Sequence, residues 1–148
     1  GDWSSDVCSS DLGGEDKYFR AGTGHLTVDI EGVAVTAFVC YDLRFADHFW
    51  MNAATTDLFI VPANWPASRA AHWRTLLEAR AIENQAYVVG VNRVGDGGSL
   101  HYGGGSRIVG PFGEDLAEAA DAETIIYADV DHGRVVDTRE RFPFLRDR

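Results

Sequence analysis

The hydrophobic pattern at the start of the chain predicts two strands joined by a tight turn. Leu26–Ile30 alternates between apolar and polar positions, as expected for a half-buried strand. Glu31-Gly32 is typical of a two-residue turn, and Val33–Val39 is a nearly continuous apolar run that favours burial on both faces of a sheet. The pattern therefore predicts a hairpin whose second strand ends at Cys40.

Two segments then show helical spacing. A helix is predicted over residues 44–54, where Phe45, Phe49 and Ala53 share a face, and a longer one over residues 70–84. Further strands are predicted over 57–62, 86–91, 106–109 and 125–130, with loops or turns at 64–66, 95–105 and 111–113. Glycine fills six of the eleven positions from 95 to 105, which indicates a loop.

Strands that alternate with helices through short connections indicate an α/β layered domain. In such sheets reactive groups gather beyond the carboxyl ends of the strands. Cys40 and the Asn64-Trp65 loop each follow a predicted strand, so we expect them at one edge of the sheet. The tail, residues 139–148, is predicted to be an extended segment that docks on another surface.

Composition sets the broad class. The 148 residues suffice for one compact domain, and 45% hydrophobic and 24% charged residues are ordinary for a soluble protein. The net charge of −10 argues against nucleic acid and anionic membranes as partners. No apolar run is long enough to span a bilayer, and no basic segment followed by an apolar one suggests a signal peptide.

The cysteine and histidine residues limit the chemistry. Two cysteines, Cys8 and Cys40, without a secretion signal predict a reducing, cytoplasmic setting in which Cys40 is a free thiol. The five histidines are scattered and form no zinc-like pair with one another or with cysteine. We therefore expect no metal site and no cofactor.

Cys40 is the candidate nucleophile. A thiolate needs a base, a cation or a helix N-terminus to activate it, and here a strand ends at Cys40 shortly before a predicted helix. The backbone N–H of Tyr41 would face the same space and could stabilise an oxyanion. The alternative is a buried structural thiol, because cysteine is among the most buried residue types.

The residues around Cys40 carry a family resemblance. The stretch Val39-Cys40-Tyr41-Asp42-Leu43-Arg44-Phe45 resembles the nucleophile motif of the nitrilase superfamily of carbon–nitrogen hydrolases. The likeness continues in order through residues 61–66, 72–88, 91–95, 105–107 and 110–114, and covers about residues 13–148. These blocks look most like the omega-amidase branch, which hydrolyses the amide of 2-oxoglutaramate-type substrates.

The resemblance implies a fold and a set of partners. It implies part of a four-layer α-β-β-α sandwich, paired into a homodimer or a higher homo-oligomer to which the tail, residues 139–148, contributes. It also implies a small-molecule amide substrate, with Cys40 as nucleophile and Tyr41, Asn64 and Trp65 at the substrate. Glu15, seven residues before Gly22, fits the second glutamate of the family mechanism.

Two further groups of that mechanism, a general-base glutamate and a lysine, lie closer to the N-terminus in the family. Residues 1–12 resemble a translated sequencing adaptor, so we expect them to be non-native and disordered, with residues 13–148 forming the C-terminal portion of a hydrolase domain. Lys17, the only lysine, is not the expected one. Losing the base and an oxyanion donor would each cost about 10² or more in rate, so we expect the chain by itself to be nearly inactive.

Several alternatives remain open at this stage. The chain could be a non-catalytic assembly module with a nitrilase-like fold, or part of an N-carbamoyl or nitrile hydrolase.

Glu83 lies one helical turn from Arg80 and is interpreted as its ion-pair partner. Asp42 and Arg44 are expected to lock the turn through charge-assisted hydrogen bonds. The glycine-rich segment 95–105 lacks the Lys-Ser/Thr of a phosphate-binding loop.

Overall fold

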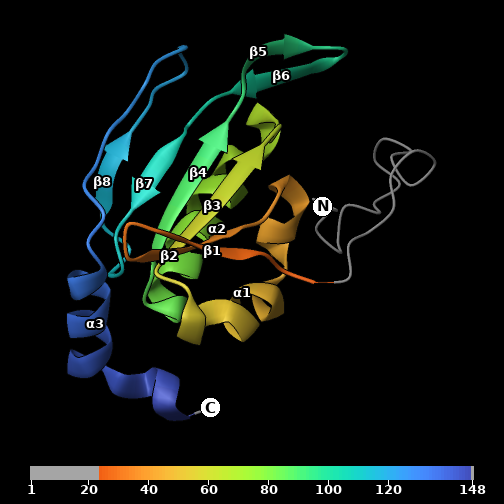
Figure 1. Ribbon diagram of the computed structural model, residues 1–148. Coiled ribbons are helices and arrows are strands. Elements are labelled where there is room, and N and C mark those ends of the chain that lie inside the picture. Colours follow the sequence, from red (N-terminus) through yellow and green to blue (C-terminus); the bar gives the residue numbers. More distant parts are fainter. Residues whose placement is uncertain (1–23, 148) are drawn as a thin grey trace.

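A computed structural model describes residues 24–147 of the chain. Its body is a six-stranded sheet in the order β1-β2-β3-β4-β7-β8, and β5 and β6 form a separate two-stranded sheet that projects beyond the end of β4 (Figure 1). The strands are β1 Thr27–Ile30, β2 Val33–Ala37, β3 Leu58–Ala63, β4 Tyr87–Asn92, β5 Val94–Gly97, β6 Leu100–Gly103, β7 Arg107–Val109 and β8 Asp115–Glu118. The α-helices are α1 Ala46–Asn52, α2 Ala70–Asn84 and α3 His132–Arg141, and the 3-10 helices are η2 Cys40–Arg44, η3 Ala53–Thr55, η4 Ala67–Arg69 and η5 Pro143–Asp147.

The three central strands run in the same direction. β2 pairs with β3 and β3 with β4 in parallel, whereas β1, β7 and β8 pair antiparallel with their neighbours. Parallel neighbours need a crossover connection, and η2 with α1 supplies the first and α2 the second. The carboxyl ends of β2, β3 and β4 therefore lie at the same edge of the sheet.

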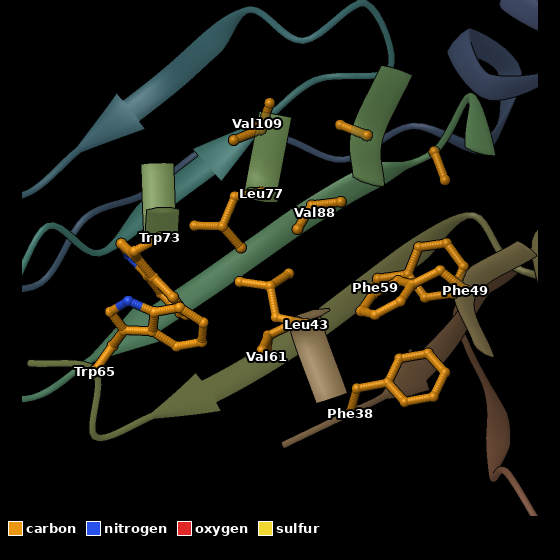
Figure 2. Close-up of a cluster of buried hydrophobic side chains, with 12 residues drawn as sticks. Phe38, Leu43, Phe49, Phe59, Val61, Trp65, Trp73, Leu77, Val88 and Val109 are labelled. Atoms are coloured by element: carbon orange, nitrogen blue, oxygen red, sulfur yellow. The ribbon is translucent and has the colours of Figure 1, made fainter. Parts of the chain in front are cut away.

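One face of the sheet forms the core against the helices. Phe59 and Val61 of β3 and Val88 of β4 belong to one buried cluster with Trp73 and Leu77 of α2. Figure 2 shows the two indoles of this cluster at one end and its phenyl rings at the other. Burying each such side chain contributes about 1.5–3 kcal/mol, so this contact between sheet and helix dominates the local stability.

The opposite face is apolar but only partly covered within the described residues. Strand register aligns Ala37, Ile60, Val89 and Ile108 in one row across four strands. Because side chains alternate along a strand, this row lies on the face away from Phe59 and Val61. In Figure 1, α2 lies behind β3 and β4, and no described helix lies in front of them. This half-exposed apolar face suits a sheet that takes a further layer, as in the expected α-β-β-α sandwich.

Several predicted elements are confirmed. Glu31 and Gly32, with φ of 53° and 86°, form the tight turn between β1 and β2, since both positions need positive φ in a type I′ turn. The long helix occupies residues 70–84 as predicted. Strands predicted over 57–62, 86–91 and 106–109 are present with ends that differ by about one residue.

The predicted helix over residues 44–54 has a different form. The chain first makes the 3-10 helix η2, then passes through Phe45 in an extended conformation before α1 begins at Ala46. The amide of Phe45 donates to the Asp42 carbonyl, which closes the turn at that point. The helical face of α1 still buries Phe49, so the periodicity was informative although the boundary was wrong.

The glycine-rich segment is not a loop throughout. Residues 94–103 pair as the hairpin β5–β6, with Val94 opposite Gly103 and Asp96 opposite His101. Glycine weakens a strand without forbidding one, and Gly98, with φ of 59°, supplies the turn. The strand β8 was not predicted at all. It pairs antiparallel with β7, and its Glu118 lies opposite Arg107 of β7.

The C-terminal predictions were wrong in both parts. Residues 125–130 form no strand, and Ile125 and Tyr127 are 73% and 81% exposed. The tail is not extended, because α3 and η5 occupy most of it. Asp131 caps α3 by accepting the Gly133 N–H at 2.8 Å, and Val135 is fully buried, so capping and burial stabilise a helix that begins before the tail and continues into it.

Candidate active site

Cys40 occupies a strained position at the carboxyl end of β2. It is the first residue of η2, has φ of 44°, and lies partly buried against the hydrophobic core. A residue with a Cβ in the left-handed region costs about 1–2 kcal/mol relative to the ordinary regions, so the surrounding contacts must hold it there. The turn follows β2, so Cys40 lies at the edge of the sheet where the parallel strands end.

Asp42 locks this turn as the sequence predicted. Its carboxylate oxygen Oδ2 accepts the Val39 N–H at 2.8 Å, and its own N–H donates to the Val39 carbonyl at 3.0 Å. The side chain is fully buried, so these hydrogen bonds are shielded from solvent. A charge-assisted hydrogen bond of this kind contributes more than a neutral one.

Arg44 acts differently from the prediction. Its guanidinium carbon lies 4.7 Å from the centroid of the Trp65 ring and 5.9 Å from that of Tyr41. It therefore fastens the turn through stacking on aromatic faces, where a hydrogen-bonded lock was expected. The contact brings the turn after β2 and the loop after β3 together, as expected for Cys40 and the Asn64-Trp65 loop.

Trp65 forms a wall of the core at this edge. It is 3% exposed, its Nε1 donates to the Arg69 carbonyl at 2.9 Å, and its ring lies 5.5 Å from that of Trp73 (Figure 2). The neighbouring Asn64 is exposed. Of the two residues expected at the substrate from this loop, Asn64 is thus open to solvent and Trp65 presents little surface.

Asn92, at the carboxyl end of β4, is a residue that the sequence reasoning did not single out. Its Oδ1 accepts the Trp65 N–H at 2.7 Å, and its Nδ2 donates to the carbonyls of Trp65 and Gly104 at 3.1 and 2.7 Å. Its backbone N–H donates to Ser106 Oγ at 2.9 Å. A polar residue at the end of an otherwise apolar strand was the signal that could have found it.

The ion pair between Arg80 and Glu83 is confirmed. Arg80 Nη1 donates to Glu83 Oε1 at 2.8 Å, which supports the structural interpretation of this glutamate. Arg80 is nonetheless buried, at 4% exposed, and its two other donor atoms, Nε and Nη2, donate to the carbonyl of Leu43. The α2 helix is thereby joined to the turn that begins at Cys40.

A second buried cation lies farther along the sheet. Arg107 of β7 is 1% exposed and forms ion pairs with Glu78 of α2 and Asp115 of β8. Burial by itself lowers the pKa of Arg107, but the hydrogen bonds that it donates to the carboxylates of Glu78 and Asp115 raise the pKa above its ordinary value. The group is charged at any ordinary pH and joins α2 to the β7–β8 edge.

Some of the other candidate residues lie in the part of the chain that the structure does not describe. Glu15, Lys17, Cys8 and the whole of segment 1–12 lie outside the described residues. Within residues 24–147 no three His, Cys, Asp or Glu side chains are grouped to hold a metal ion, and no helix is both long and apolar enough to cross a membrane.

An apolar hollow of about 260 Å³ lies between α2 and α3, away from Cys40; its lining includes Ile82, Gln85, Phe112 and Phe142.

Comparison with known proteins places the chain in a family. Residues 10–140 match the carbon-nitrogen hydrolase family. The chain is 46% identical over 136 residues to the omega-amidase YafV of Escherichia coli and 35% identical over 136 residues to the 2-oxoglutaramate amidase of Bacillus subtilis, covering 90% of this chain and 52% of either relative. The crystal structure of XC1258 from Xanthomonas campestris, described as a CN-hydrolase superfamily protein with an arsenic adduct in the active site, superimposes with a TM-score of 0.84 at 37% identity; the match covers 92% of this chain and 54% of that one.

The fold and the site thus define an α/β protein with a cysteine at the carboxyl edge of its parallel strands. The chain belongs to the carbon–nitrogen hydrolase family, within the nitrilase superfamily, and the two curated relatives named above are an omega-amidase and a 2-oxoglutaramate amidase. It spans about half the length of those relatives. The nitrilase-type fold expected from the sequence motifs is confirmed by the structural match.

Proposed function

We propose that this chain forms the nucleophile-bearing part of an amidase that hydrolyses the terminal amide of small carboxylic acids, as an omega-amidase does. The observation that carries the proposal is the left-handed Cys40 at the junction of β2 and η2. Strain of this kind persists at functional sites because the surrounding structure fixes it. The identity to an omega-amidase and to a 2-oxoglutaramate amidase supports the choice of substrate class.

The proposed reaction has two halves. The Cys40 thiolate attacks the amide carbonyl carbon, and the resulting oxyanion accepts a hydrogen bond from the N–H of Tyr41. The C–N bond then breaks, the nitrogen takes the proton that the thiol lost on forming the thiolate and leaves as ammonia, and a thioester to Cys40 remains. Water attacks the thioester, which releases the carboxylic acid and returns the thiol.

The remaining candidate residues have proposed roles in the same scheme. Glu15 is proposed as the second glutamate of the family mechanism, and Tyr41, Asn64 and Trp65 are proposed to border the substrate. Asn64 is exposed at the edge where Cys40 lies and is suited to a direct contact. Trp65 acts mainly as a rigid surface of the substrate site, because its ring packs against the ring of Trp73. We further propose a cytoplasmic enzyme that works without a cofactor as a homodimer or higher homo-oligomer.

A chimaera tests the proposal directly. The part of the Escherichia coli omega-amidase that precedes its match is joined to residues 13–148 of this chain, and ammonia release from 2-oxoglutaramate and succinamate is measured. Activity in the chimaera, lost in its Cys40→Ala variant, is the expected result. A folded chimaera without activity on these amides would oppose the proposal and favour the assembly module. Activity on N-carbamoyl or nitrile substrates alone would reassign the substrate class.

A further inference from the structure

Arg80 makes an unusual contact for a residue in the middle of a helix. Its Nε and Nη2 both donate to the single carbonyl oxygen of Leu43, at 3.1 and 2.7 Å. The side chain lies almost wholly out of solvent, and Leu43 is fully buried. A buried cation of this kind is costly unless its donors are satisfied, and here the third arm is satisfied by Glu83.

The accepting carbonyl belongs to the turn that starts at the candidate nucleophile. Leu43 lies three residues after Cys40 within η2, a helix of five residues. The Val39–Asp42 hydrogen bonds hold the entry to this turn, and Arg80 holds its last part from outside. The phenyl ring of Phe49, 5.3 Å from the Arg80 guanidinium carbon, closes the space on another side.

We propose that Arg80 is a positioning residue for Cys40: by clamping the Leu43 carbonyl onto α2, it keeps Cys40 in the left-handed conformation that presents its thiol. The inference rests on the proposed role of Cys40 as nucleophile. The planar fork of arginine places two N–H groups on one acceptor, and lysine has no such geometry. Without the clamp, η2 relaxes toward an ordinary turn, because left-handed Cys40 is unfavourable by itself.

The test measures thiol reactivity in the full 148-residue chain with Cys8→Ser, which leaves Cys40 as the single thiol. The rate of alkylation by iodoacetamide is recorded against pH for the parent, for Arg80→Lys and for Glu83→Gln, beside a blocked free cysteine. Circular dichroism confirms that each protein is folded at the assay temperature. Glu83→Gln is the matched control, because it alters the other arm of Arg80 and leaves the Leu43 contact in place.

In the parent, Cys40 is expected to react faster at neutral pH than the blocked cysteine. Arg80→Lys should react about 5- to 10-fold more slowly at pH 7, with a pH profile moved toward that of the free thiol, and Glu83→Gln should resemble the parent. A fast parent with an unchanged Arg80→Lys profile overturns the positioning role alone. A parent no faster than the free thiol removes the proposed nucleophile and this inference with it.

A second variant distinguishes the positioning role of Arg80 from a merely structural one. If Arg80→Lys does not fold, Arg80→Gln, which keeps a single donor nitrogen of shorter reach, is measured in the same way. A folded Arg80→Gln with slowed alkylation supports the positioning role, and one with the parent profile overturns it. If neither variant folds, Arg80 is a determinant of folding and the proposal is overturned.

Discussion

The side-chain amide of Asn92 forms a reciprocal pair with the backbone of Trp65. Oδ1 of Asn92 accepts the Trp65 N–H at 2.7 Å, and Nδ2 donates to the Trp65 carbonyl at 3.1 Å. Asn92 ends β4 and Trp65 follows β3, so the pair joins the carboxyl ends of two neighbouring parallel strands. The Asn64-Trp65 loop is therefore held to the neighbouring strand by the side chain of Asn92, which has no role in the proposed reaction.

Replacing Asn92 by alanine should lower the free energy of unfolding by about 2–3 kcal/mol, because the buried N–H and carbonyl of Trp65 lose their partners. Urea denaturation followed by circular dichroism measures the change. Asn64→Ala is the matched control, since Asn64 is exposed and in the same loop; a change within about 0.5 kcal/mol is expected there. Equal losses in the free energy of unfolding would show that the hydrogen bonds between Asn92 and Trp65 do not contribute the expected stability.

Asp42 should matter for both stability and thiol reactivity. Asp42→Ala removes the acceptor of the Val39 N–H at the entry to the Cys40 turn and is expected to cost about 1.5–3 kcal/mol. Asp42→Asn retains an oxygen acceptor without the charge, so an intermediate loss is expected. Thermal unfolding and the iodoacetamide rate of Cys40 measure the two effects. An alanine variant as stable as the parent would contradict the lock.

Gly90 should tolerate no side chain without a cost in stability. A Cβ at this position would lie 2.5 Å from Leu77 Cδ1 and 2.7 Å from Trp73 Cζ2, both in the packed core. Gly90→Ala is therefore expected to lower the free energy of unfolding by about 1–3 kcal/mol. A Cβ at Gly97 would meet only the end of the exposed Arg93 side chain, which can move. Gly97→Ala is thus the control and should unfold at a temperature close to that of the parent.

The ion pairs of Arg107 predict a stability effect that does not change with pH over the ordinary range. The folded-state pKa of Arg107 is raised, so its contribution to stability is present below its unfolded pKa and is lost only in strong alkali. Arg107→Met should lower the melting temperature by a similar amount at pH 7 and pH 9.

Asp115→Asn should also destabilise, because it leaves the buried guanidinium of Arg107 with fewer carboxylate partners. Glu118→Gln, which alters a largely exposed pair with Arg74, should have little effect and serves as its control. A strong loss of the Arg107→Met effect between pH 7 and pH 9 would contradict the assignment of the charged state.

The sequence by itself predicted the central layers of the fold. The turn at Glu31-Gly32, the helix at residues 70–84 and the apolar strands on either side of it were all correct, because local periodicity reports which face is buried. It also singled out Asp42, whose hydrogen bond to the Val39 N–H is present, and Cys40, whose role as nucleophile stays a prediction. The ordered blocks of residues gave the family, which the comparisons then showed.

The tertiary structure decided what depends on contacts between distant segments. The hairpin at residues 94–103 and the strand β8 form because pairing partners are available, while residues 125–130, with equally suitable side chains, have no strand partner among the described residues. Likewise, only the fold shows that Asn92 reaches Trp65, 27 positions away, and that Arg80 reaches Leu43, 37 positions away. Hydrogen bonds of this range leave no periodic trace in a sequence, because a partner's identity depends on the packing of the whole sheet.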